Sequence, residues 1–370
     1  MRALPLALLL ATAPTLAADC ADWPAWQDFA RQFISADGRV IDPSSPRKIT
    51  TSEGQAYAAF FALVGNDPAR FAQLLDWTRD NLAAGDLSAR LPAWLWGQRD
   101  DGQWGVLDAN AASDADVWLA YSLIEAGARW QRPEWAALGR LLAQRIVREE
   151  SAELPGLGRT LLPGPQGFTP QPGHWRLNPS YLAWPVIDGL AAAEPSWRPL
   201  AASSRTALLA SVKTGYAPDW LGWSRAGPAP DPQHGDLGSY DAIRVYLWAG
   251  MLHPASPHRQ TLLKQLAPMA QRTAADGAPP EKIRTASGQL AGQGPAGFSA
   301  ALAVLLSARG QHAAADSQWL RRDALWPRAR GNYYDNMLHL FAQGWREGRY
   351  RFAADGRLQW PKEGVCLPLH

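Results

Sequence analysis

Carboxylates at three predicted helix starts are the side chains of this sequence best suited to catalysis. Glu53 lies in KITTSEGQAY, Asp114 and Asp116 lie in NAASDADVWLAYSLIEA, and Asp241 lies in GSYDAIRVYLWAG, each close behind a serine. If the helices pack as a ring of antiparallel pairs, every second helix starts on the same face, and these acids converge on one cleft. The alternative for any single cluster is structural, because acids in a first helical turn complement the helix dipole.

Other kinds of chemistry lack their usual sequence patterns. None of the 7 His has metal-ligand spacing, and no G-x-S-x-G, P-loop or dinucleotide-binding fingerprint occurs. We therefore expect no metal and no cofactor. The balance of 36 Lys and Arg against 34 Asp and Glu gives a net charge of +2, which favours neither nucleic acid nor an anionic membrane as a partner.

Tryptophan is unusually abundant, with 19 Trp against 9 Phe and 9 Tyr. A buried indole N–H needs a hydrogen-bond partner, so this number exceeds what core packing usually requires. Sugars stack their C–H faces on aromatic rings, and Trp94 and Trp96 in LPAWLWG are candidates for such stacking. Core packing is the expected role of Trp77, Trp130 and Trp345.

The elements that position these residues are mostly helical. About twelve helices alternate with Pro- and Gly-rich connections, and they are predicted at 24–34, 53–64, 68–83, 114–130, 133–149, 180–193, 198–213, 241–252, 257–273, 297–309, 315–323 and 333–347. Asp67 before Pro68 predicts a capped helix start, and Ser52 with Gln55 predicts a capping box.

Strand patterns are almost absent from the sequence. The C-terminal YRFAADGRLQW, with Asp355-Gly356 between two short alternations, predicts a β-hairpin. Segments 154–178 and 215–238 are rich in Gly and Pro and are expected to form long ordered loops. No domain boundary is evident, so residues 19–370 are predicted to form a single helical domain.

The first 18 residues have the features of a secretory signal peptide, with Arg2 before an apolar run and small residues before the cleavage point. No other long apolar run predicts a membrane span. Cys20 and Cys366, the two cysteines, lie at opposite ends of the mature chain. In an oxidising periplasm they can form a disulfide, and two unpaired thiols are the alternative.

Several motifs resemble a known family. ASDADVWLAYSLIEAGARW resembles the signature of glycoside hydrolase family 8, with Leu119 departing mildly at an Ile/Met position. Within that family, the closest resemblance is to the periplasmic endo-β-1,4-glucanases of bacterial cellulose-synthesis operons. It is carried by DPSSPRKITTSEGQAY, LPAWLWG, LNPSYL, SYDAIRVYLWAGM, PPEK and GPAGFSAAL.

The resemblance implies a mainly α fold, an (α/α)6 barrel, and hydrolysis of β-1,4-glucan with inversion. It assigns Glu53 as the general acid and Asp241 as the base that activates water. Inversion requires the two carboxyl groups to stand ~6.5–9.5 Å apart so that a water fits between them.

The same resemblance suggests further substrate contacts. Asp114, with Asp116 as its partner, is expected to hold the sugar at the cleavage subsite. Arg244 and Tyr181 resemble the family's supporting groups near the base and the water. A β-1,4-glucan chain, and beyond it the cellulose synthesis or export proteins, are the expected partners of a monomeric, periplasmic or secreted enzyme.

Three other functions compete with the cellulase prediction. A family member acting on chitosan, xylan or mixed-linkage glucan is one, although the Trp-rich composition favours a neutral glucan. A polysaccharide lyase would require a basic site, which the near-neutral charge does not favour. A non-catalytic glycan-binding protein would lack the acid or the base, and both Glu53 and Asp241 are present.

Overall fold

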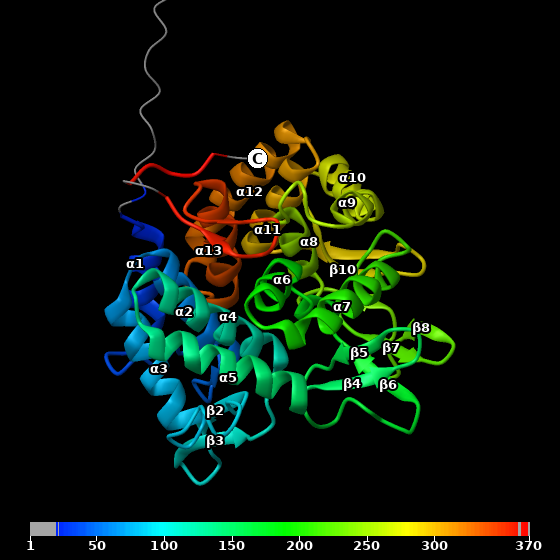
Figure 1. The fold of residues 1–370 in the computed structure, drawn as a ribbon. Helices are drawn as coiled ribbons and strands as arrows, with labels where there is room; N and C mark the ends of the chain where they lie inside the picture. The colour runs from blue at the N-terminus through cyan, green and yellow to red at the C-terminus, as the bar shows by residue number, and fades with distance from the viewer. Residues whose placement is uncertain (1–19, 21, 362–363, 369–370) are drawn as a thin grey trace, which may run out of the picture.

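Six helices form a closed inner ring in the computed structural model, which describes residues 20, 22–361 and 364–368 (Figure 1). Each helix contacts the next, and the last contacts the first, in the order α2 (Ser52–Val64), α4 (Ser113–Arg129), α6 (Trp184–Ala193), α8 (Ile243–Gly250), α11 (Ala296–Ala308) and α13 (Tyr333–Arg346). This ring is the inner layer of an (α/α)6 barrel, which confirms the predicted fold class.

A second layer of helices packs around the ring. Each outer helix contacts one inner helix: α3 (Pro68–Leu82) on α2, α5 (Pro133–Glu149) on α4, α7 (Arg198–Ser211) on α6, α9 (Arg259–Gln265) on α8, α12 (His312–Ala329) on α11 and α1 (Pro24–Phe33) on α13. The helix predicted at 257–273 is two helices, α9 and α10 (Ala267–Asp276), which meet at Leu266. The described residues therefore contain thirteen α-helices, close to the expected twelve.

The two layers follow from two kinds of helix sequence. Helix α2 is apolar on all sides and buries every residue from Gly54 to Val64, as a helix enclosed by others must. Helix α1 instead buries one stripe, Trp26, Phe29, Ala30 and Phe33, at the spacing of a single helical face.

The helix α4–α5 contact depends on glycine. A Cβ added to Gly139 of α5 would lie 2.7 Å from the Ala120 carbonyl oxygen of α4, and one added to Gly127 would lie 2.6 Å from the Ala136 nitrogen. Real side chains do not approach so closely. The two glycines therefore let α5 lie close against the middle and the C-terminal end of α4.

Helix starts were predicted with mixed success. Asp67 caps α3 as expected, but the capping box of Ser52 with Gln55 was wrong. Thr51 is the N-cap of α2 and accepts a hydrogen bond from the Gly54 N–H at 3.0 Å. The Gln55 amide is buried and instead bonds to backbone and side-chain groups of neighbouring segments, at Val40, Gly38, Leu74 and Thr78.

Short strands occupy several connections that were predicted to be loops. They form the sheets β1 (Thr50–Thr51)–β2 (Leu95–Gln98)–β3 (Trp104–Asp108), β4 (Ser151–Leu154)–β5 (Gly158–Leu161), β6 (His174–Leu177)–β7 (Leu221–Ser224)–β8 (Gly227–Pro230) and β9 (Leu237–Gly238)–β10 (Pro280–Arg284)–β11 (Leu290–Gln293). The loop prediction for 154–178 and 215–238 was therefore wrong, because strands of two to five residues are too short to show alternation. The C-terminal hairpin, β12 (Arg351–Phe352) with β13 (Leu358–Gln359), is confirmed.

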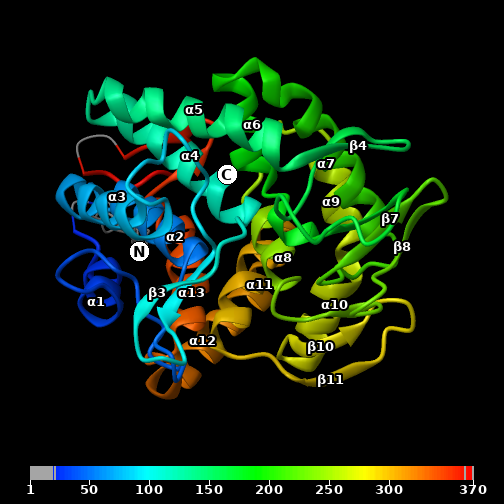
Figure 2. The same ribbon diagram turned by 90° about the horizontal axis from the view of Figure 1, so that it is seen from below.

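Two ends of the ring differ in what covers them. The β2–β3 hairpin and the β6–β8 sheet lie toward the lower end in Figure 1, and Figure 2 views them from that side. The C-terminal segment lies at the upper end, where a disulfide joins Cys20 to Cys366 with their Cα atoms 5.3 Å apart. The predicted pairing of the two cysteines is confirmed.

The predicted signal peptide, residues 1–18, lies outside the described residues. Within the described chain, no helix has both the length and the apolar composition needed to cross a membrane. The buried residues form a core cluster shared by both helix layers. Trp345 belongs to its buried part and the partly buried Trp130 packs against it, as expected. Trp77 is also buried but lies outside this cluster, with its ring against Trp96.

Candidate active site

One arginine gathers the predicted acids. Arg244 on α8 forms ion pairs with Glu53, with Asp241 at 2.8 Å, and with Asp114 at 3.5 Å, and its side chain is 3% exposed. Its second terminal nitrogen also donates to Ser180 Oγ at 3.1 Å. We call these five residues the Arg244 cluster.

Helix starts bring the acids together. Glu53 is the second residue of α2, Asp114 is the second residue of α4, and Asp241 lies two residues before α8. All three acids lie at the starts of inner-ring helices and pair with one guanidinium, so the convergence expected from the sequence is confirmed. The Glu53 and Asp241 side chains are 21% and 32% exposed, and the cluster therefore reaches solvent.

Asp114 is the buried acid of the cluster. Its Oδ1 accepts a hydrogen bond from the Ala115 N–H at 2.8 Å. Burial raises the pKa of Asp114 well above its usual value, and the neighbouring Glu53 charge raises it further, while Arg244 opposes both effects. Asp114 is therefore protonated more readily than an ordinary aspartate, and its protonated form can donate as well as accept a hydrogen bond.

Asp241 has a different environment. Burial raises its pKa, Arg244 lowers it, and the Asn178 amide and the Trp220 indole face the carboxyl and favour its ionised form. Trp220 is fixed by stacking on Phe168, with ring centroids 5.9 Å apart. A half-buried carboxylate with a raised pKa and a fixed orientation is suited to accept a proton.

The NPSY segment supports Arg244 from a short 3-10 helix, Pro179–Tyr181. Asn178 caps it by accepting hydrogen bonds from the Ser180 N–H and hydroxyl at 3.0 and 2.7 Å. Ser180 is thereby oriented to accept from Arg244. The Tyr181 ring lies beside the guanidinium, 5.7 Å from its centre, and burial raises the pKa of the Tyr181 hydroxyl, which stays a donor.

Asp116 does not belong to the cluster, contrary to its predicted partnership with Asp114. Two residues along an α-helix turn a side chain by about 200°, so Asp116 points away from Arg244 into the barrel wall. It is 1% exposed and lies against Glu150, the C-cap residue that follows α5 and is fully buried. Burial raises the pKa of both carboxyls.

Comparison with known proteins identifies the family. The model of the glycosyl hydrolases family 8 matches residues 2–348. The chain belongs to this family. It is a glycoside hydrolase, and the Arg244 cluster lies where three of the family-like motifs, T-S-E-G-Q, S-D-A-D and S-Y-D, meet in space.

Close relatives cover nearly the whole chain. The chain is 49% identical over 356 residues to an endoglucanase of Xanthomonas axonopodis pv. citri (strain 306), covering 95% of this chain and 92% of that protein. It is 43% identical over 368 residues to an endoglucanase of Escherichia coli (strain K12), covering 98% and 97%. The crystal structure of an endo-1,4-D-glucanase from Vibrio fischeri ES114 has a TM-score of 0.88 and 41% identity, covering 91% of this chain and 99% of that chain.

The tryptophans of LPAWLWG lie next to the glycosidase site. The Trp94 carbonyl accepts a hydrogen bond from the Ser52 N–H at 3.0 Å, immediately before Glu53. Trp96 pairs with Thr50 across β1 and β2, and its ring stacks on Trp104 with centroids 5.3 Å apart. Trp104 is 45% exposed, which leaves part of its ring free.

Sequence reasoning missed several residues around the Arg244 cluster and its neighbouring tryptophans: Ser180, Asn178, Trp220 and Trp104. The first two lie within the LNPSYL motif, so the motif itself could have indicated them. Trp220 and Trp104 had no such signal, because Trp220 is placed by the pairing of β6 with β7, far apart in the sequence, and Trp104 by the short β2–β3 hairpin. Among the described residues, no three His, Cys, Asp or Glu side chains gather in a way that could hold a metal ion.

Proposed function

We propose that this family 8 hydrolase is an endo-β-1,4-glucanase that cleaves internal bonds of cellulose with inversion, using Glu53 as acid and Asp241 as base. The observation that carries the proposal is the sharing of one guanidinium, Arg244, by the two carboxyls. Support also comes from the relatives named endoglucanase at 42–49% identity.

The reaction divides between the two acids. The Glu53 carboxyl gives its proton to the glycosidic oxygen as the bond to the anomeric carbon breaks. Asp241 takes a proton from the water that attacks that carbon from the opposite face, and the new anomer has inverted configuration. Inversion requires a separation of ~6.5–9.5 Å between the two carboxyls, so that the attacking water fits between them.

The remaining groups would bind the sugar. Asp114, in its protonated form, can donate a hydrogen bond to a hydroxyl of the glucose unit at the cleavage point. The Tyr181 hydroxyl can do the same beside Arg244. Neutral donors suit an uncharged glucan, and the rings of Trp94 and Trp96 offer flat faces for stacking.

The biological setting is part of the same proposal. The motif resemblance to the glucanases of cellulose-synthesis operons suggests that the enzyme trims cellulose during synthesis and export, as a monomer in the periplasm or outside the cell. The signal-like residues 1–18 and the Cys20–Cys366 disulfide support an oxidising compartment.

The test is hydrolysis of a soluble cellulose derivative by the mature protein, with NMR detection of the first product anomer. Glu53→Gln and Asp241→Asn should each reduce kcat by about 10²–10⁴-fold, the usual contribution of a general acid or base. Asp86→Asn, an exposed carboxylate outside the site, is the matched control. The α-anomer should appear first from wild type.

Other outcomes would redirect the proposal. Faster cleavage of xylan or chitosan in the same assay would mean that the substrate is that glycan and not cellulose. Initial release of the β-anomer, or full activity in either variant, would remove the acid and base assignment.

A further inference from the structure

A second aspartate holds the backbone that carries Asp241. Asp219 precedes β7 and is 9% exposed. Its Oδ1 accepts hydrogen bonds from the N–H groups of Ser239, Asp241 and Ala242 at 2.7, 3.1 and 2.8 Å. Its own N–H donates to the Leu237 carbonyl at 2.7 Å.

These three N–H groups belong to the turn that leads into α8, whose first helical residue is Ile243. A buried N–H without a hydrogen-bond partner costs free energy, so this turn needs an acceptor for them. The first N–H groups of α8 itself donate to carbonyl groups of the same turn. Asp219 accepts the N–H groups of the turn from 20 to 23 residues earlier in the chain. Burial raises the pKa of Asp219 to about 6, so that it remains an ionised acceptor at neutral pH.

The next residue, Trp220, contacts Asp241 from the other side. Its indole faces the Asp241 carboxyl and favours the ionised form. It is held between rings, since Phe168 and His234 stack on it with centroids 5.9 and 6.1 Å away. The dipeptide Asp219-Trp220 therefore fixes both the backbone and the side chain of Asp241.

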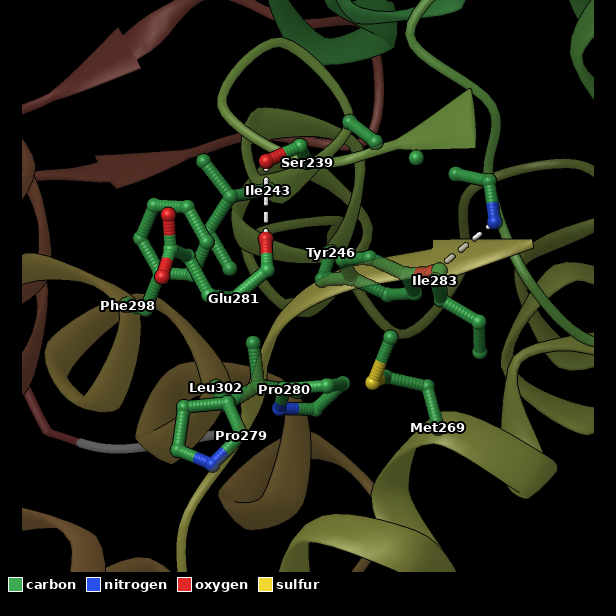
Figure 3. A pocket seen from close by; sticks show the side chains of 13 residues that line it. Ser239, Ile243, Tyr246, Met269, Pro279, Pro280, Glu281, Ile283, Phe298 and Leu302 are labelled. Atoms are coloured by element: carbon green, nitrogen blue, oxygen red, sulfur yellow. Dashed lines mark hydrogen bonds between the residues drawn. The ribbon is translucent and has the colours of Figure 1, made fainter. Parts of the chain in front are cut away.

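The rear of the turn has a looser support. Figure 3 shows a pocket behind it, where Ser239 Oγ donates to the Glu281 carbonyl at 2.7 Å and the Ala217 N–H donates to the Tyr246 hydroxyl at 2.8 Å. The pocket is otherwise lined mainly by apolar side chains, including Ile243 and Phe298. The three directed hydrogen bonds to Asp219 constrain the orientation of the turn in addition to these contacts.

We propose that Asp219 is the positioning residue of the catalytic base, fixing the Asp241 carboxyl where it can receive the proton of the attacking water. The proposal rests on the function proposed above. This role requires a carboxylate or amide oxygen at the position of Asp219 Oδ1. Only an oxygen at that position can accept hydrogen bonds from all three N–H groups.

The first measurement is steady-state kinetics on the soluble cellulose derivative. Asp219→Ala should lower kcat by about 100-fold, the cost expected of a 1 Å misplacement, with little change in KM. Asp219→Asn keeps an acceptor oxygen and should recover most of kcat. Asp219→Glu keeps the charge but moves it by one methylene, and it should lose kcat as Asp219→Ala does. Asp67→Ala, which removes the cap of α3 away from the site, is the matched control.

The second measurement, hydrogen exchange over residues 237–243, does not depend on substrate. Exchange should rise in Asp219→Ala and Asp219→Glu and stay near wild type in Asp219→Asn. If the wild type does not cleave the glucan, the proposed function fails while the exchange pattern still decides whether Asp219 holds the turn.

Any of three results would overturn the role of Asp219. The first is an unchanged kcat in Asp219→Ala, and the second is a loss of kcat in Asp67→Ala as large as that in Asp219→Ala. The third is hydrogen exchange over residues 237–243 that does not rise in Asp219→Ala. If Asp219→Ala does not fold, Asp219→Glu against Asp219→Asn decides the question: equal kcat in the two variants would refute positioning.

Discussion

Asp114 and Asp116 lie in the same turn of α4, yet they face different surroundings. Both are buried, at 2% and 1% exposure. Asp114 faces the Arg244 cluster, where a guanidinium partly offsets its charge. Asp116 faces Glu150, and within the described residues neither of these two carboxyls has a salt bridge to a cation.

The difference shows how a motif can combine two roles. A rotation of about 200° separates the two side chains, so the S-D-A-D motif sends one acid toward the substrate side and the other into the wall between α4 and α5. An ionised carboxylate buried without a cation is costly, and such a pair keeps protons instead. Asp114 is suited to catalysis, whereas Asp116 and Glu150 are a structural pair.

The largest expected effect is a difference in kcat between variants of Asp114 and Asp116. Asp114→Asn should lower kcat by about 10²-fold or more, because it changes a group that pairs with Arg244 and, in the proposed function, binds the sugar at the cleavage point. Asp116→Asn should stay within about tenfold of wild type, since its side chain does not reach the cluster. Kinetics on the soluble cellulose derivative measure both variants.

Circular dichroism serves as the folding control for this pair of variants. A loss of kcat in Asp116→Asn as large as that in Asp114→Asn, with both proteins folded, would contradict the division of roles.

A smaller effect concerns the pH dependence of stability. Burial raises the folded-state pKa of Asp116 and Glu150 above their unfolded values. The unfolded chain then loses these protons at lower pH than the folded chain, so the pair makes stability fall as pH rises from about 4 through the folded pKa values. Glu150→Gln removes one titrating group while keeping the shape.

Calorimetry at several pH values between 5 and 8 measures this effect. The Tm of Glu150→Gln should fall less than that of wild type over this range, by about a few degrees. Asp86→Asn, an exposed carboxylate, should follow the wild-type curve. Parallel curves for wild type and Glu150→Gln would mean that the pair does not hold its protons.

The sequence predicted the ring better than its connections. Amphipathic spacing located outer helices such as α1, and long apolar runs located inner helices such as α2 and α11. Motifs placed Glu53, Asp114, Asp241 and Arg244 together, since each lies near a helix start. They did not resolve Asp116, because the direction of a side chain depends on the rotation of α4.

Contacts between residues far apart in the sequence could not be predicted from local sequence patterns. The N–H groups of the turn before α8 are accepted by Asp219, 20 to 23 residues earlier in the chain, and Trp220 contacts Asp241 only because of the β6–β7–β8 sheet. The strands of that sheet have four residues each, too few for a pattern. Glu150 likewise meets Asp116 only when α5 packs on α4 through Gly127 and Gly139.

The smallest expected effect lies beyond both aspartates, at the exposed ring of Trp104. This indole stacks on Trp96, and the Arg39 guanidinium lies 4.8 Å from its centre. Trp96 pairs with Thr50, three residues before Glu53, so a long glucan leaving the site on this side can reach the stack. Trp104→Ala should raise KM for a long soluble glucan by about three- to tenfold, the equivalent of one aromatic contact, and leave kcat near wild type.

The opposite kinetic result would contradict this binding role. Trp104 touches no residue of the Arg244 cluster in the contacts described. A fall in kcat at unchanged KM would therefore mean that the β2–β3 hairpin positions Glu53 and does not bind the glucan.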